Sequence, residues 1–167
     1  GLVGSEMCIR DSASTKEHCK KATIVWDKFH LMQNFEKAVD ETRKNIHLSF
    51  YKNSDMRRLT RGKYKFIFLK KAYRRTKEEQ ELIDEIIQIN EPIAQLEMIK
   101  ELMLEMFNKP NAKEAYETFQ LAASWSMRHG KFFKPLIQWF TKLEEAWSTV
   151  KNYFKFAVTT SLSEGIN

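Results

Sequence analysis

A carboxylate and an imidazole lie three residues apart at Asp27 and His30. They directly follow a short apolar, β-branched run, Ala22 to Trp26, which predicts a buried strand. At the end of a strand, such a pair can share a metal ion, or the imidazole can orient a carboxylate or a nucleophile. Without other support the residues favour a simpler interpretation, in which Asp27 caps the following helix and His30 is a half-buried side chain.

A second candidate carboxylate, Glu164, stands in the polar segment TTSLSEGIN at residues 159–167. Carboxylate oxygens are ligands that Mg²⁺ prefers, so Glu164 is a candidate metal ligand. Ser-x-x-Glu patterns also begin many helices. Taken by itself, the segment is therefore interpreted more simply as a polar tail with a helix-starting glutamate.

The third feature is a basic stretch between Asn53 and Lys77, with no acidic residue from Met56 to Lys77. Lys and Arg neutralise phosphates, and rings interleaved with them can stack on unpaired bases. A solvated charged face with its rings in the core accounts for the pattern equally well, and the spacing does not separate strand from helix. The candidate DNA-contacting residues are Arg57, Arg58, Arg61, Lys63, Lys65, Lys70, Lys71, Arg74 and Arg75.

These residues must be positioned by a chain that we expect to be mainly α-helical. Only 5 Gly and 3 Pro argue against a loop-rich β fold. Apolar residues follow helical spacing from Phe29 onward, so a strand, an Asp and a helix would form an α/β unit. Residues 77–157 are expected to be mostly helix. The signals are Thr76 with Glu79 as a capping box, Asn90 with Pro92 and Asn111 as helix starts, and Gly130 as a helix end.

The last helix, predicted from about Phe132 to Ala157, carries a heptad seam. The seam could pair two copies as a coiled coil, but packing inside a helical bundle is favoured because partner helices already exist in the chain. Its members are Phe133, Leu136, Phe140, Leu143, Trp147, Val150 and Phe154.

Bulk properties restrict the function classes. A net charge of +6 and a pI of about 9.2 favour an anionic partner such as nucleic acid. Cys8 and Cys19 form no Cys-x-x-Cys pair, which favours a reduced cytoplasm. No apolar run approaches the roughly 20 residues of a membrane span. Residues 1–12 lack periodicity and resemble translated adaptor sequence, so no function is assigned to them.

Taken together, the segments resemble the bacterial insertion-sequence transposases of the ISL-three type. IVWDKFHLMQNFEKAVDETRK is similar to their D-x-F-H segment with its amphipathic helix, and the helix that begins TKEEQ is similar to their T-x-E-Q helix. SLSEGIN is similar to their T/S-x-x-x-E-G-x-N motif. The resemblance runs from about Ala22 to Asn167, and the order and separation of its short motifs make it fairly specific.

This resemblance implies a DDE enzyme that cleaves and transfers DNA strands with Mg²⁺. Three carboxylates of an RNase H-like core hold two Mg²⁺ ions in such enzymes. Glu164 matches the third carboxylate. Asp27 is either the second carboxylate or, with His30, the D-x-x-H element that follows it, and the latter is favoured. Both Glu164 and Asp27 are therefore candidate metal ligands, with an earlier Asp expected upstream.

The resemblance also divides the chain. Residues 13–52 would be part of the RNase H-like core, 53–157 a helical insertion that contacts DNA, and 158–167 the start of the returning core segment. We therefore expect an internal transposase fragment, inactive by itself, from a protein that binds transposon ends and target DNA and could form a homodimer. The alternatives are a helical nucleic-acid-binding module without catalysis and a helical interaction protein.

Overall fold

A computed structural model describes residues 2–5, 23–50 and 52–155 of the chain. Two strands, β1 (Leu2–Ser5) and β2 (Thr23–Trp26), pair in parallel, with Leu2 opposite Thr23. β2 occupies the segment in which the β-branched run predicts a strand. β1 lies within residues 1–12, for which the amino-acid pattern predicts no element. The remaining described elements are helices, so the expected mainly α-helical class is confirmed.

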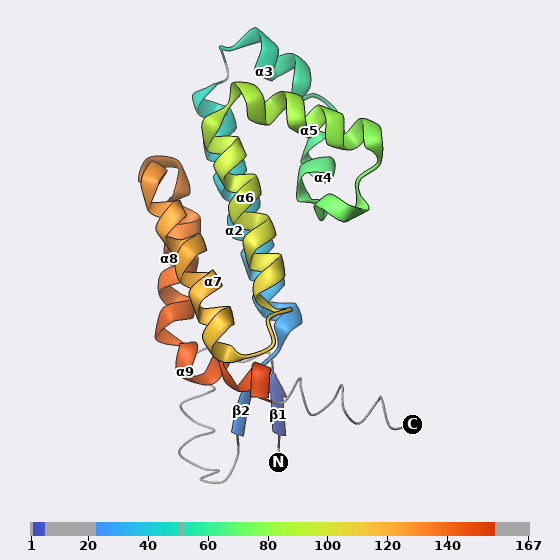
Figure 1. Cartoon of the computed structure of the whole chain (residues 1–167). Coiled ribbons are helices and arrows are strands. Elements are labelled where there is room, and N and C mark those ends of the chain that lie inside the picture. Colours follow the sequence, from blue (N-terminus) through green and yellow to red (C-terminus); the bar gives the residue numbers. More distant parts are fainter. Residues whose placement is uncertain (1, 6–22, 51, 156–167) are drawn as a thin grey trace.

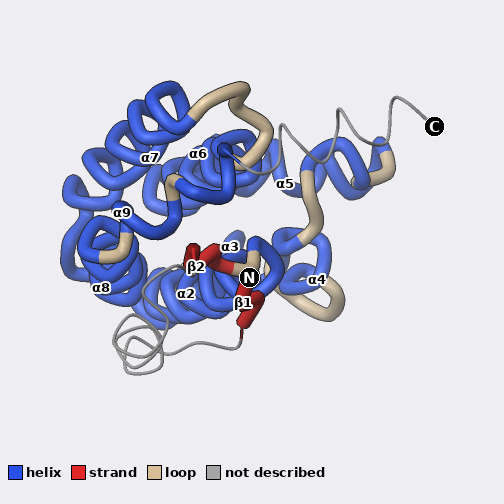
Figure 2. Tube along the Cα trace, turned by 90° about the horizontal axis from the view of Figure 1, so that it is seen from below, coloured by secondary structure: helices blue, strands red, loops and turns tan. Residues whose placement is uncertain are grey.

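Four helices form a bundle in which successive members run antiparallel (Figure 1). They are α2 (Lys28–Ser49), α6 (Glu91–Met106), α7 (Ala112–Ser126) and α8 (Gly130–Glu145). The contacts pair α2 with α8 and α6, and α7 with α6 and α8, which closes the ring. Seen from the strand end, the four helices surround one core (Figure 2).

The helix starts follow from local side-chain caps. Thr76 and Glu79 form the predicted capping box at the start of α5 (Lys77–Ile89). The side chains of Asn90 and Asn111 accept hydrogen bonds from the Ile93 and Glu114 amides, both at 2.9 Å, and begin α6 and α7. Each cap satisfies an amide that has no partner within its helix, which is why these starts could be predicted.

The heptad seam packs inside the bundle, as the favoured interpretation predicted. Phe133, Leu136, Phe140 and Leu143 are buried on α8, and Trp147 stacks on Phe119 of α7 at 5.6 Å between ring centroids. The seam is therefore not a face on which a second copy could form a coiled coil.

The prediction of one uninterrupted helix from Phe132 to Ala157 is wrong. α8 ends at Glu145, and a short helix, α9 (Trp147–Val150), follows after Ala146 and packs beside β2. Gly130 likewise does not end α7, which stops at Ser126 before the 3₁₀ turn η2 (Met127–His129). Gly130 has φ −46° and is the first residue of α8, so its backbone needs no left-handed conformation there.

The basic stretch folds as two short helices and a 3₁₀ turn beside the bundle (Figure 1). These are α3 (Ser54–Leu59), α4 (Tyr64–Leu69) and η1 (Ala72–Arg74), with α5 packed against the two helices. Gly62 has φ +62° in the turn between α3 and α4, a conformation that other residues rarely adopt. On α4, Tyr64 and Phe68 are buried four residues apart, while Phe66 between them is 66% exposed. In the sequence Tyr64, Phe66 and Phe68 alternate with other residues, but helical spacing buries the first and last rings and exposes Phe66.

Candidate functional site

Asp27 stands between β2 and α2, where its carboxylate caps the helix. Oδ1 accepts a hydrogen bond from the Phe29 amide at 2.9 Å, and Nδ1 of His30 donates to Oδ2 at 2.9 Å. Both side chains are about two-fifths exposed. Asp27 therefore caps α2, as in the simpler interpretation, and it also forms the carboxylate–imidazole pair of the metal-site interpretation, at a helix start open to solvent.

The Asp27 carboxyl is held in its ionised form. Its pKa lies below the ordinary value of 3.8, mainly because His30 and then the Phe29 amide donate hydrogen bonds to the charged form. The folded-state pKa is depressed, so the resulting stabilisation is present above the unfolded pKa and is lost as the pH falls through the folded one. The pH window for this loss lies below about 4.

We expect Asp27→Ala to lower the free energy of unfolding by about 1 kcal/mol, because α2 loses its N-cap. Asp27→Asn keeps a capping oxygen but removes the charge. Its difference from wild type should therefore shrink as the pH falls from 5 to 2 in urea titrations. Glu36→Ala, on the exposed face of the same helix, should change stability by less than about 0.5 kcal/mol. An Asp27→Asn difference that stays constant over this pH range would rule out the charge as its cause.

Asp27 is suited to supply one ligand of a metal site. It offers an ionised carboxylate, and each oxygen keeps a lone pair beyond the one hydrogen bond that it accepts. Within residues 2–5, 23–50 and 52–155, no three His, Cys, Asp or Glu side chains gather as a metal cage would need. Glu164 lies outside the described residues, as do Cys8 and Cys19.

The helical region returns to the strand from which it departs. The chain leaves β2 at Trp26, and α9 comes back beside β2 after the whole bundle has been completed. The Lys28 ammonium lies 5.5 Å from the Phe107 ring centroid and 5.9 Å from that of Tyr153. Lys28 directly follows Asp27, so the two ends of the helical region meet next to Asp27.

Most of the candidate DNA-contacting residues reach the surface. Arg58, Lys65 and Lys70 pair with Glu85, Asp40 and Glu79 at 2.8, 3.4 and 2.6 Å. The side chains of these cations are 64%, 45% and 41% exposed, so each remains accessible to a further partner. The exposed cations are Arg57, Arg58, Arg61, Lys63, Lys65, Lys70 and Arg74, and Lys71 is half-buried.

Residues 10–167 match a family model described as a transposase, the DDE type of ISL3 insertion sequences. The chain belongs to this transposase family. The match includes both the D-x-F-H and the S-E-G-x-N segments, together with the helices between them. The transposase matched no curated protein and no solved structure. None of its described helices is long and apolar enough to cross a membrane.

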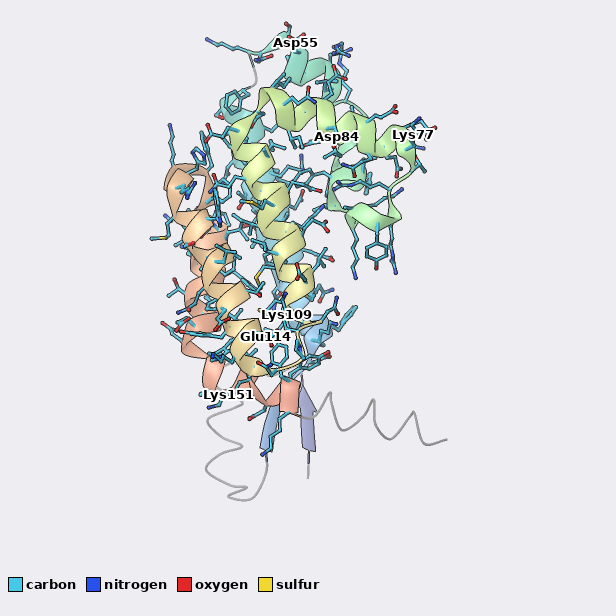
Figure 3. The ribbon with its side chains drawn as sticks, viewed as in Figure 1. Asp55, Lys77, Asp84, Lys109, Glu114 and Lys151 are labelled. Atoms are coloured by element: carbon cyan, nitrogen blue, oxygen red, sulfur yellow. The ribbon has the colours of Figure 1, made fainter. Side chains whose placement is uncertain are left out.

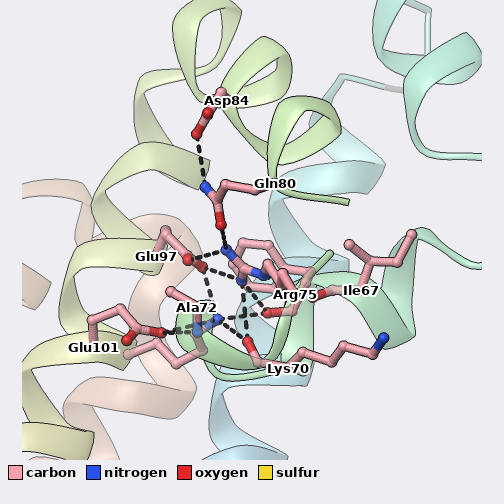
Figure 4. Close-up of polar contacts among 10 residues, drawn as sticks. Ile67, Lys70, Ala72, Arg75, Gln80, Asp84, Glu97 and Glu101 are labelled. Carbon is pink, nitrogen blue, oxygen red and sulfur yellow. Dashed lines mark hydrogen bonds and ion pairs between the residues drawn. The ribbon is translucent and has the colours of Figure 1, made fainter. Parts of the chain in front are cut away.

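Arg75 departs from the DNA-contacting role predicted for it, because the side chain is fully buried in this transposase. Its guanidinium pairs with both carboxylate oxygens of Glu97 on α6, at 2.5 and 3.0 Å. It also donates to the carbonyls of Ile67, Phe68 and Lys70 (Figure 4). Nothing in the pattern of basic residues indicates that one of them faces inward.

A second buried cation, Lys100 on α6, completes this network. Its ammonium lies 2.9 Å from a carboxylate oxygen of Glu97 and donates to the carbonyls of Phe68 and Lys70 at 2.6 and 2.9 Å. Burial lowers the pKa of Lys100, although the neighbouring Glu97 charge opposes the shift. The backbone between α4 and α5 is thus fixed to the bundle by charged groups, a role that sequence reasoning missed. The signal available was the opposite charges of Glu97 and Lys100, spaced three apart on α6.

Proposed function

We propose that this chain carries the helical insertion and part of the metal site of a DDE transposase that cleaves and transfers DNA strands. The observation that carries the proposal is the family match over residues 10–167, which includes both carboxylate-bearing motifs. A helical nucleic-acid-binding module without catalysis would explain the exposed cations. It would give no reason for the S-E-G-x-N motif at residues 163–167.

In this proposal β2 and α2 belong to an RNase H-like core, and the elements from α3 to α9 form an insertion within it. The return of α9 to β2 supports this division, because an insertion must bring the chain back to the sheet that it interrupts. From Tyr153, 11 residues can span at most roughly 35 Å when extended. Glu164 is therefore within reach of Asp27 despite their separation in sequence.

Asp27 and Glu164 would hold Mg²⁺, which activates the attacking water or 3′-hydroxyl and stabilises the leaving oxygen. His30 would fix the orientation of the Asp27 carboxylate through the bond from Nδ1. The hydrogen bond between His30 and Asp27 matches the D-x-x-H element that follows the second carboxylate, and we favour that element for this pair. The exposed cations would hold DNA phosphates. The protein would act in the cytoplasm, as a homodimer.

Reversing the charge of three exposed cations, Arg61, Lys63 and Arg74, should weaken DNA binding at least about tenfold at 0.1 M salt. Interactions with phosphates carry no sequence information, so duplexes of unrelated sequence should be affected equally. The log–log dependence of affinity on salt should flatten by roughly 0.9 for each phosphate that the variant no longer neutralises. Fluorescence anisotropy of labelled duplexes over a salt series measures both quantities.

The matched control reverses Lys113, Lys142 and Lys151, which are also exposed. Lys151 lies at the strand end of the bundle, away from Lys77 and Asp55 (Figure 3). Each reversal changes the charge by −2, so both triple variants bring the formal net charge of +6 to zero. Equal losses in the two variants would show that total charge, and not a DNA-contacting surface, accounts for binding.

A further inference from the structure

Tyr73 is a large aromatic side chain presented to solvent in the middle of the basic stretch. It lies in η1 and is 74% exposed, the highest value among the exposed large hydrophobic residues described. The Lys71 ammonium and the Arg74 guanidinium lie 5.9 and 5.7 Å from its ring centroid. An exposed ring with cations close to it is a combination by which proteins bind unpaired nucleic acid.

Hydrogen bonds with Arg75 and with α6 fix the backbone that carries Tyr73. Arg75 and Lys100 donate to the carbonyls that precede η1, and the Ala72 amide donates to Glu101 at 3.2 Å. Exposed tyrosines on mobile loops lose entropy when they bind a ligand, whereas a ring on a fixed loop loses less. The network drawn in Figure 4 therefore fixes the loop before a ligand binds, so that Tyr73 loses less entropy on binding.

An open hollow of about 450 Å³ lies beside the ring. Lys77 and Glu81 stand at its wall. Gln80 and Asp84 hydrogen-bond to each other at 2.7 Å, and each keeps a further amide N–H or carboxylate oxygen that can contact the edge of a base. The volume falls within the range of small-molecule sites. A base stacked on Tyr73 would thus have polar partners available at its edge.

We propose that Tyr73 is a stacking platform for an unpaired DNA base, with Lys71 and Arg74 binding the phosphates on either side. The inference rests on the proposed function, because it takes DNA as the ligand. The bases of an intact duplex are stacked on one another, so only an unpaired base offers a free face to the ring.

The test compares binding of the 167-residue chain to fluorescein-labelled dT20 and to a labelled 20-base-pair duplex. Tyr73→Ala should weaken binding to dT20 by about 5- to 150-fold and leave duplex binding unchanged, while Tyr73→Phe should behave as wild type. Lys71→Gln should flatten the salt dependence for dT20 by roughly 0.7, and Tyr73→Ala should leave that slope alone. Phe66→Ala is the matched control. Phe66 is similarly exposed, at 66%, but the cation next to its ring, Lys65, forms an ion pair with Asp40.

Unchanged dT20 binding by Tyr73→Ala would overturn the inference while leaving the DNA-binding surface intact. An equal loss for dT20 and duplex would also overturn it, since Tyr73 would then only shape the loop. Tighter wild-type binding to rU20 than to dT20 would replace DNA by RNA as the ligand. If the wild-type chain bound neither labelled DNA, the DNA-binding part of the proposed function would fail together with this inference.

Discussion

Replacing Glu97 by glutamine is expected to lower the free energy of unfolding by about 3–5 kcal/mol. Glu97 is the carboxylate that both buried cations share, with Arg75 fully buried and Lys100 only 5% exposed. Without the Glu97 charge, the cations of Arg75 and Lys100 would stay in the protein interior. Their remaining partners would be backbone carbonyls and, for Lys100, the half-buried Glu101. Removing one partner of a buried ion pair costs far more than the pair contributes relative to apolar residues.

Urea titrations of wild type and Glu97→Gln measure this loss directly. Glu81→Gln provides the control, because Glu81 is 65% exposed and its partner Lys77 lies 3.9 Å away, so less than about 0.5 kcal/mol should be lost. Replacing Arg75, Glu97 and Lys100 together by methionine should recover part of the loss, because no buried charge remains, although the Phe68 and Lys70 carbonyls then lose these donors. A Glu97→Gln loss no larger than that of Glu81→Gln would mean that the network does not hold the basic loop.

Local signals in the sequence predicted the parts of the fold that depend on local contacts. Thr76, Asn90 and Asn111 each cap a helix through an amide three residues on, so their spacing alone identified three helix starts. The buried seam on α8 was also predictable, because its heptad spacing marks one apolar face. The break at Ala146 was not, since it depends on α9 packing beside β2, a contact remote in sequence.

Arg75 shows why the candidate site was harder to predict than the helices. Its sequence neighbours are cations that reach the surface, whereas its partner Glu97 lies 22 residues further along the chain. No local pattern separates an inward-facing arginine from an outward-facing one. Asp27 and His30 were identifiable because their spacing places both within one helical turn, where the hydrogen bond forms.

The second large effect concerns Glu164. In an intact transposase that contains these residues, Glu164→Gln should reduce strand cleavage and transfer by roughly 1000-fold or more. In the proposed site Glu164 would supply a charged oxygen ligand to Mg²⁺, and a neutral amide is a poor replacement for such a ligand. DNA affinity should stay unchanged, because the cations that we propose to bind phosphates lie on α3, α4 and the following loop. Glu145→Gln, an exposed change at the end of α8, is the control.

Strand transfer by that transposase on a labelled transposon-end duplex, with Mg²⁺ or Mn²⁺, is the most direct test of the DDE assignment. We expect products from wild type and Glu145→Gln, and none from Glu164→Gln although it still binds the duplex. The 167-residue chain alone should bind without cleaving, because Asp27 and Glu164 supply at most two of the three carboxylates that the family resemblance implies. Strand transfer by Glu164→Gln at the wild-type rate would contradict the placement of this residue in the metal site.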